Sequence, residues 1–193
     1  MEQIKRESSE RTELVADACG VAEAITGMAE RLYERVSQLR KGELILAGIP
    51  SRGVEVARRL GSGLVALGGA EPTLGVVDVS MHRDDLAMRS RLTTVEETEL
   101  PLDLEGRPLV LVDDVLFTGR TIRAAMDAVA SFGRPGRIWL AVLIDRVGHR
   151  ELPIQPDFVG RSLQTEVGER IRVRFESLDG VADSVRVVTS GEG

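Results

Sequence analysis

Apolar and polar positions along the chain follow two alternating patterns, which predict strands separated by helices. Apolar runs that are typical of buried strands cover residues 43–49, 74–81, 109–112 and 138–144. Apolar residues at helical spacing cover residues 12–39, 54–67 and 121–132. Three shorter strands are expected at residues 157–160, 171–175 and 184–188. Strands that alternate with helices predict an α/β fold with a mainly parallel sheet wrapped by helices.

Polar stretches without periodicity mark the segments that we expect to be flexible. Residues 1–11 are polar and are expected to be disordered. Residues 82–104 are polar and rich in turn-forming residues, so they are predicted to form a flexible flap. Gly20 and Gly27 are poor residues for the middle of a helix, and they predict that the first helix is short or broken early. The length suits one domain over residues 1–193.

Composition and charge narrow the class of protein. The chain of 193 residues is 42% hydrophobic and 29% charged, which is ordinary for a soluble globular protein. Its net charge of −6 argues against a protein that coats nucleic acid non-specifically. Cys19 is the one cysteine, so no internal disulfide is expected. No apolar run approaches the roughly 20 residues of a membrane span, so we expect a cytoplasmic protein without a membrane partner.

Candidate chemistry is concentrated directly after the predicted strand at residues 109–112. Asp113 and Asp114 follow the strand, and a turn with Thr118, Gly119, Arg120 and Thr121 leads into a predicted helix. Backbone N–H groups of such a turn, the helix start and the threonine hydroxyls can hold a phosphate. The two acids can accept hydrogen bonds from neighbouring sugar hydroxyls. The alternative, an ordinary turn in which one Asp caps the helix, does not require the second acid. The pattern therefore favours a sugar-phosphate site.

This stretch resembles the phosphoribosyl-diphosphate (PRPP) signature of the type I phosphoribosyltransferases. A longer match, from about residue 14 to residue 173, is similar to the bifunctional pyrimidine operon attenuation protein/uracil phosphoribosyltransferase family. It is carried by VDDVLFTGRT at 112–121, FGRP at 132–135, the strand at 140–145, GHRELPI at 148–154, GIPSRG at 48–53 and HRDDL at 82–86. The resemblance implies the type I phosphoribosyltransferase fold, in which helices flank a mainly parallel twisted sheet and a small flap, or hood, covers the site.

The resemblance also implies an activity. The enzyme would make UMP and diphosphate from uracil and PRPP with Mg²⁺, and it would regulate pyrimidine genes by binding their leader mRNA in response to UMP or UTP. One alternative is a non-catalytic nucleotide-sensing attenuator on the same fold. Another is a transferase for purines or orotate, against which the GHRELPI run argues. By analogy with relatives we expect a homodimer or a higher homo-oligomer.

Site residues follow from the same resemblance. Asp113, Asp114 and Arg52 are predicted to be catalytic: the acids would hold the ribose 2- and 3-hydroxyls, and Arg52 would neutralise the leaving diphosphate. Mg²⁺ would be held mainly by PRPP and water, without a direct protein ligand. The predicted PRPP-binding residues are Ser51, Arg52, Gly53, Arg83, Asp113, Asp114, Val115, Leu116, Phe117, Thr118, Gly119, Arg120 and Thr121.

The loop at residues 50–53 and the flap differ in how specific their patterns are. Ser51, Arg52 and Gly53 follow an apolar strand, and Gly53 would let the backbone approach a ligand closely. The alternative is a plain turn with a surface arginine. Pro50 and Ser51 stand where relatives usually carry a basic residue and Thr, which reduces the positive charge of the loop. Arg83 would close over the diphosphate, or it belongs to a solvated charge cluster.

For the base we predict contacts from Arg146, Phe158, Val159 and Ile171. The ring of Phe158 would stack on uracil. The alternative, that Phe158 is a core residue, agrees with the sequence almost as well. Backbone groups near Val159 or Ile171 would read the polar edge of the base. Val147 looks like an extra residue relative to the family, which affects the positions of Arg146 and His149. We expect His149 to be a surface or interface residue rather than a catalytic one.

The RNA contacts have weaker support. Members of the family that bind leader RNA place basic residues along the first helix, whereas Ala22, Glu23, Gly27 and Glu30 supply no positive charge here. The residues that remain as predicted RNA contacts are Thr26, Arg35, Arg150 and Arg161. Together with Arg170, Arg172 and Arg174, the last two could form a basic face, for which the alternative is a solvated surface.

Overall fold

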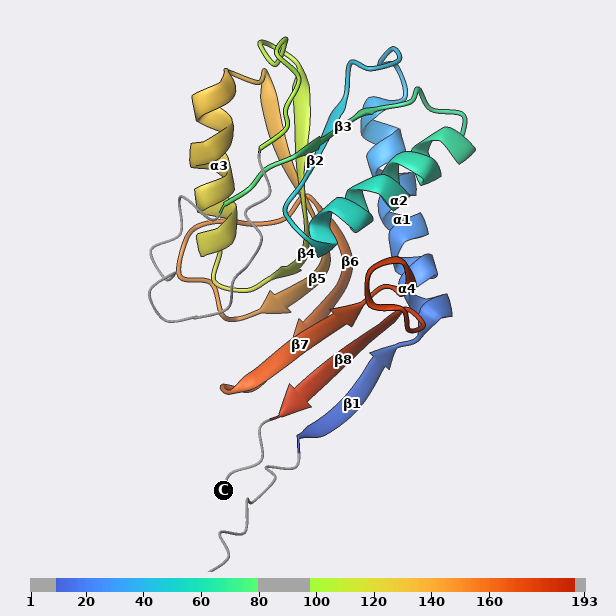
Figure 1. Cartoon of the computed structure of the whole chain (residues 1–193), viewed down its shortest axis with the longest axis vertical. Helices are drawn as coiled ribbons and strands as arrows, with labels where there is room; N and C mark the ends of the chain where they lie inside the picture. The colour runs from blue at the N-terminus through green and yellow to red at the C-terminus, as the bar shows by residue number, and fades with distance from the viewer. Residues whose placement is uncertain (1–9, 80–97, 190–193) are drawn as a thin grey trace, which may run out of the picture.

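The computed structural model describes residues 10–79 and 98–189, which form two sheets and four helices (Figure 1). The larger sheet has five parallel strands in the order β3-β2-β4-β5-β6. Its strands are β2 (Ile45–Gly48), β3 (Thr73–Val76), β4 (Pro108–Leu116), β5 (Arg137–Val147) and β6 (Phe158–Gln164). The helices are α1 (Ala18–Val36), α2 (Arg52–Ala66), α3 (Arg120–Phe132) and α4 (Glu176–Asp179). The mainly parallel α/β fold is therefore confirmed.

Helices cover both faces of the five-stranded sheet, as Figure 1 shows, and each face has its own hydrophobic core. On one face α1 and α2 pack on Leu46, Val110 and Val112. On the other face α3 packs on Leu109 and Leu111. Residues 109–112 of β4 are each 0% exposed, which explains why this strand is a continuous apolar run rather than an alternating one.

The strand order places a ligand site between β2 and β4. The chain runs from β2 outward to β3 and then returns to β4 on the other side of β2, so the order reverses between these two strands. In open α/β sheets the crevice at such a reversal, outside the carboxyl ends of the strands, binds ligands. The turn after β2 and the turn after β4 both lie at this end.

Two glycines bring the start of α2 against β4. A Cβ atom on Gly53 would lie 2.4 Å from the carbonyl oxygen of Val112, and one on Gly48 would lie 2.5 Å from Cα of Val54. Any larger residue would push the helix away from the strand. Gly53 was predicted to allow close approach to a ligand, but the close approach in the structure is to β4 itself. The consequence is that the β2–α2 turn is held beside Asp113.

A second sheet of three antiparallel strands, called the hood sheet below, lies beyond the carboxyl ends of β4 and β5 (Figure 1). Its strands β1 (Arg11–Ala16), β8 (Ser184–Thr189) and β7 (Glu169–Arg174) occur in that order, so β7 is an edge strand. The valines Val173 and Val185 join the core that α1 and α2 cover. The hood sheet therefore shares a core with the larger sheet.

The sequence-based prediction for the beginning of the chain was wrong in two respects. Residues 12–39 were predicted as one helix, but β1 precedes α1, and Asp17 caps the helix by accepting a 3.0 Å hydrogen bond from the N–H of Gly20. Residues 10 and 11, predicted to be disordered, are ordered: Glu10 pairs with Arg172 and Arg11 begins β1. Gly20 and Gly27 do not break α1, because its buried face supplies more than the propensity that they lose.

Most of the other predicted elements are confirmed within a few residues. β4 and β5 are longer than predicted, since β4 continues through Asp113 and Asp114 to Leu116. The predicted flap lies largely outside the described residues, but residues 98–104 are held in place. Glu99 and Val76 exchange two 2.9 Å backbone hydrogen bonds, and Leu104 is 1% exposed. Within residues 10–79 and 98–189, no helix has both the length and the apolar character that crossing a membrane requires.

Candidate active site

The acid pair, Asp113 and Asp114, lies on β4 just past the level at which β2 ends. Asp113 is 7% exposed and Asp114 is half-buried. The backbone N–H of Asp114 donates a 2.9 Å hydrogen bond to Oδ1 of Asp113, which orients the Asp113 carboxylate. Burial raises the pKa of the Asp114 carboxyl, while a hydrogen bond with Asp113 and the charge of Arg52 act in the opposite direction. Two carboxyl groups are thus held together in a poorly solvated place.

The phosphate loop, residues 117–119, connects β4 to α3. Gly119 is the N-cap of α3 with φ +93°, a conformation that favours glycine, and no side chain caps this helix. Oγ1 of Thr118 accepts a 3.4 Å hydrogen bond from the N–H of Arg120. A helix start without a side-chain cap presents backbone N–H groups to an anion. The geometry therefore suits the phosphate predicted for Thr118 to Thr121.

A bracing loop, residues 148–154, packs against the phosphate loop. A Cβ atom on Gly119 would lie 3.3 Å from Cδ1 of Ile154, and the N–H of Glu151 donates a 3.0 Å hydrogen bond to the carbonyl of Thr118. The side chains of Arg120 and Glu151 form an ion pair with an N–O distance of 2.6 Å. The GHRELPI run that carried the family resemblance is thus the wall of the phosphate loop.

Arg150 connects the bracing loop to the phosphate loop and to β5. Its guanidinium donates hydrogen bonds to four backbone carbonyls and forms an ion pair with Asp145, and its side chain is 18% exposed. The four carbonyls belong to Leu116, Phe117, Arg146 and Ile154. Nε and Nη1 donate to the carbonyls and Nη2 to the carboxylate, so all three nitrogens of the guanidinium are engaged within the protein. The structure therefore assigns Arg150 to the phosphate loop, contrary to the RNA-binding prediction.

Arg52 reaches from the start of α2 to the hood sheet. Its Nε donates a 2.7 Å hydrogen bond to the carbonyl of Val173, and its Nη2 lies 2.6 Å from Oδ1 of Asp179. Its charge also acts on the Asp114 carboxyl, so it lies beside the acid pair. Ser51, which precedes it, is exposed, and the Pro50–Ser51 peptide bond is cis. The cation predicted to meet a diphosphate is therefore present at the site, where Asp179 partly balances its charge.

A second ion-pair network fastens the hood sheet to α2. Glu55, which is 6% exposed, accepts hydrogen bonds from Arg58 and Arg59. Arg59 also pairs with Asp183, which lies just before β8, and its guanidinium sits 4.6 Å from the ring centroid of Phe175. The hydrogen bond from Arg58 is the main reason that the pKa of Glu55 falls to about 2. The pairs of Glu55 with Arg58 and Arg59 lie within one turn of α2, whereas the contacts of Arg59 with Asp183 and Phe175 join distant parts of the chain and have no local signal in the sequence.

The predicted stacking of Phe158 on the base is corrected by the structure. The ring of Phe158 is 2% exposed and packs in the core, with its centroid 6.5 Å from that of Trp139 in a T-shaped arrangement. It is a core residue and does not stack on a ligand. The carbonyl of Val159 accepts a 2.5 Å hydrogen bond from Arg31 of α1, and a backbone contact of Val159 with the base stays a prediction.

Arg146 is also not a base contact. It is 5% exposed, and Thr165 Oγ1 accepts hydrogen bonds of 3.0 and 2.8 Å from its Nε and Nη2. Nη2 also donates a 3.1 Å hydrogen bond to the carbonyl of Glu169. Its guanidinium lies 3.9 Å from the ring centroid of Phe117. Protein groups thus surround this side chain on every side that the structure describes.

His149 and the extra Val147 lie beside Arg146. Nε2 of His149 is 2.9 Å from the carbonyl of Thr165, and its ring centroid is 5.1 Å from that of Phe117. Val147 pairs with Gln164 at the end of the β5–β6 ladder.

The backbone of Ile171 lies on the free edge of β7, where it is available for the predicted contact with the base. Main-chain groups of alternate residues face the free edge of an edge strand. On β7 the carbonyls of Glu169 and Val173 accept hydrogen bonds from Arg146 and Arg52. By this alternation the N–H and C=O of Ile171, midway between them, face the same edge and the same crevice.

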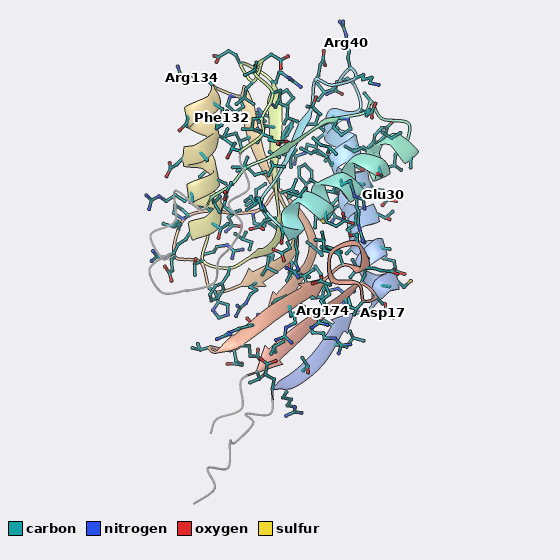
Figure 2. All side chains as sticks on the ribbon, viewed as in Figure 1. Asp17, Glu30, Arg40, Phe132, Arg134 and Arg174 are labelled. Atoms are coloured by element: carbon teal, nitrogen blue, oxygen red, sulfur yellow. The ribbon has the colours of Figure 1, made fainter. Side chains whose placement is uncertain are left out.

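The remaining predicted residues are not gathered in one place. Thr26 and Arg35 are exposed on α1, although the guanidinium of Arg35 lies 5.9 Å from the ring centroid of Phe158. Arg161 donates a 2.7 Å hydrogen bond to the carbonyl of Val15. Glu30, labelled in Figure 2, is exposed on α1 and adds no positive charge there. Arg83 lies outside the described residues.

The fold and the site define a class of protein. Residues 14–175 match the model of the phosphoribosyl transferase domain family, and the chain belongs to that family. A hypoxanthine phosphoribosyltransferase from Staphylococcus aureus has a similar fold, with a TM-score of 0.66, 14% identity and 96% of each chain covered. A hypoxanthine-guanine-xanthine phosphoribosyltransferase gives a TM-score of 0.65 at 13% identity, covering 90% of this chain and 92% of the other.

Closer relatives identify the branch. The Bifunctional protein PyrR of Chloroflexus aurantiacus is 47% identical over 171 residues, which are 89% of this chain and 92% of the relative. The Bifunctional protein PyrR of Listeria welshimeri is 42% identical over 175 residues, covering 89% and 94% of the two chains. The chain is a member of the bifunctional PyrR family, which confirms the family predicted from the motifs.

Proposed function

We propose that this protein transfers the ribose 5-phosphate of PRPP to uracil, forming UMP and diphosphate. The observation that carries the proposal is the acid pair at the carboxyl end of β4, between the phosphate loop and the turn that bears Arg52. As C1 of the ribose loses diphosphate, positive charge spreads over C1 and the ring oxygen. The two carboxylates would hold the ribose hydroxyls and stabilise this charge.

The phosphates of PRPP have separate partners in this arrangement. The phosphate loop and the first turn of α3 hold the 5-phosphate, because uncapped backbone N–H groups and the Thr118 hydroxyl point there. Arg52 exchanges part of its pairing with Asp179 for the departing diphosphate. Arg83 remains a prediction for the same group. These contacts would bind the phosphates of PRPP, and the acid pair would bind its ribose hydroxyls.

Mg²⁺ suits this site as a substrate-borne ion. Carboxylate oxygens are hard donors of the kind that Mg²⁺ prefers, and the acid pair supplies them. Among the residues that the structure describes, no three or more His, Cys, Asp or Glu side chains gather as a metal cage. The ion would therefore be held mainly by PRPP oxygens and water, where it would offset the negative charge of the diphosphate.

Uracil would be read by the free edge of β7. Its O2, N3–H and O4 form an acceptor–donor–acceptor edge, and the N–H and C=O of Ile171 offer a complementary donor and acceptor. Fixed backbone groups discriminate strongly, because a base without the matching atoms leaves them unpaired. This assignment replaces Phe158 and Arg146 as direct base contacts.

The second part of the proposal is regulation through leader mRNA by a UMP- or UTP-bound homo-oligomer. Its support in this chain is the hood sheet rather than α1. Arg170, Arg172 and Arg174 alternate along β7, and Arg186 of β8 lies directly opposite Arg172. Among the described residues, Glu10 is the acid that pairs with this row. Like charges placed opposite each other are unfavourable without an anionic partner, and a phosphate backbone supplies one.

Turnover with uracil tests the catalytic part. The expected result is UMP formation from PRPP, uracil and Mg²⁺, with no product from hypoxanthine, guanine or orotate run in parallel. Asp113→Asn combined with Asp114→Asn should lower kcat/KM by roughly 10³-fold with the fold unchanged by circular dichroism. Asp127→Asn, which alters an exposed ion pair with Arg123 on α3, is the matched control. Near-normal turnover by the double variant refutes the assigned role, whereas UMP binding without turnover by the wild type favours a nucleotide-sensing attenuator.

A further inference from the structure

Arg146 touches three separate parts of the chain at once. It lies near the carboxyl end of β5 and contacts Phe117 of the phosphate loop, Thr165 after β6 and Glu169 of β7. Few single side chains span such distant segments. These contacts connect the loop that would hold the 5-phosphate with the strand that would read the base.

Stability alone is a poor explanation for this buried cation. Arg146 is 5% exposed, and within residues 10–79 and 98–189 no carboxylate forms an ion pair with it. Its partners are a hydroxyl, a carbonyl and an aromatic face, and burial lowers the pKa of its guanidinium. The charge of Glu169 acts in the opposite direction without forming an ion pair. A buried charge without an ion pair costs free energy that an apolar residue of the same size would avoid. The presence of Arg146 at this buried position therefore indicates that the planar geometry of its guanidinium is needed there.

The geometry at the two ends is specific to a guanidinium. The planar group stacks on the Phe117 ring with a centroid distance of 3.9 Å, as arginine commonly does on aromatic rings. The N–H groups in the same plane bind Thr165 Oγ1 and the Glu169 carbonyl. Glu169 is two residues before Ile171 on the same strand, so a shift of the guanidinium plane would move both Phe117 and the free edge of β7.

We propose that Arg146 is a positioning residue that couples the phosphate loop to the base-reading edge of β7. An anion that orders the phosphate loop fixes Phe117, Phe117 fixes the plane of Arg146, and Arg146 sets the position of β7 next to Ile171. Occupation of the phosphate site then increases the affinity for uracil, and the reverse holds by linkage. The inference rests on the proposed function, since it takes the ligands of the two sites from it.

Equilibrium binding to the full chain tests the coupling without any reaction. The affinity for uracil is measured by calorimetry with and without saturating ribose 5-phosphate. In the wild type ribose 5-phosphate should tighten uracil binding by about tenfold, within the usual range of coupling between sites. In Arg146→Met the enhancement should disappear, and Arg146→Lys should not restore it, because an ammonium neither stacks as a plane nor donates in a fixed fork. Arg123→Met, on the exposed face of α3, should keep the full enhancement.

Thr165→Val is a second variant that preserves volume and removes the hydroxyl acceptor. It should reduce the enhancement, and it decides the matter if Arg146→Met does not fold by circular dichroism. A wild type without enhancement, or folded variants that keep all of it, would overturn the proposal. Failure of the proposed function is distinguishable, because it appears as a wild type that makes no UMP while the binding ratio still reports on Arg146.

Discussion

Replacing Glu55 by Gln should destabilise the protein in a way that depends on pH. Glu55 is 6% exposed, and hydrogen bonds from Arg58 and Arg59 lower its pKa from 4.5 to about 2. At about 1.4 kcal/mol per pH unit, a group with these two pKa values contributes about 3 kcal/mol to the free energy of unfolding at pH 7. The value is an upper limit, because the glutamine retains part of the hydrogen bonding.

The sign of the pH dependence follows from the lowered pKa. The contribution is fully present above the unfolded value of 4.5 and is lost as the pH falls towards the folded value of about 2. At pH 3 it should have fallen to about 1 kcal/mol, so wild type and Glu55→Gln should converge in acid. Other carboxylates titrate in the same window, and the comparison between the two proteins removes their contribution.

Urea denaturation at pH 7, 5, 4 and 3 measures this difference. Both proteins should show similar m-values, and the gap between their free energies of unfolding should narrow steadily below pH 4.5. Glu71→Gln is the control, since Glu71 pairs with Lys41 on the exposed surface and should change stability little at any pH. A gap that is absent at pH 7, or that stays constant down to pH 3, would refute the role given to the Glu55 network.

Two further predictions concern the phosphate loop and the RNA. Arg150→Gln removes most of the donors that hold the carbonyls of Leu116 and Phe117. The KM for PRPP should therefore rise by about tenfold with a smaller change in kcat. An unchanged KM in steady-state kinetics would contradict the bracing role. Arg170→Ser and Arg174→Ser should each weaken binding to leader RNA and lower the slope of log affinity against log salt by about one. Filter-binding titrations measure this, and a larger effect of Arg35→Ser would instead favour α1 as the RNA surface.

The catalytic centre was predictable because its parts are adjacent along the chain. The strand, the acid pair, the phosphate loop and the helix start occupy residues 109–121 without interruption, and the structure has the strand and the helix where the sequence predicted them. The bracing loop was predictable as a family motif, although its function as the wall of the phosphate loop was not. The contact of Gly53 with Val112 was not predicted, and the approach of its backbone to a ligand stays a prediction.

Predictions failed where one residue has partners far away in the sequence. Residues 12–16 were included in the predicted helix, yet they pair with β8 about 170 positions later, and that ladder decides their conformation. Phe158 stacks on nothing outside the core because Trp139 and the α1 side of the sheet enclose it. The roles of the arginines were ambiguous for the same reason. The sequence alone does not show whether an arginine binds a substrate, an RNA or a carbonyl of the protein.

Local sequence thus determined what this protein can bind, because a phosphate loop and an acid pair depend on consecutive residues and on the backbone angles that they favour. The tertiary structure alone decided how those parts are held. Arg52, Arg146 and Arg150 find their acceptors on β7, on the turn after β6 and on the phosphate loop, and these positions exist only after the two sheets have packed. Contacts between distant residues form only when folding overcomes the entropy of closing the loop between them, and they leave no local pattern in the sequence. The roles of these arginines are therefore seen only in the folded chain.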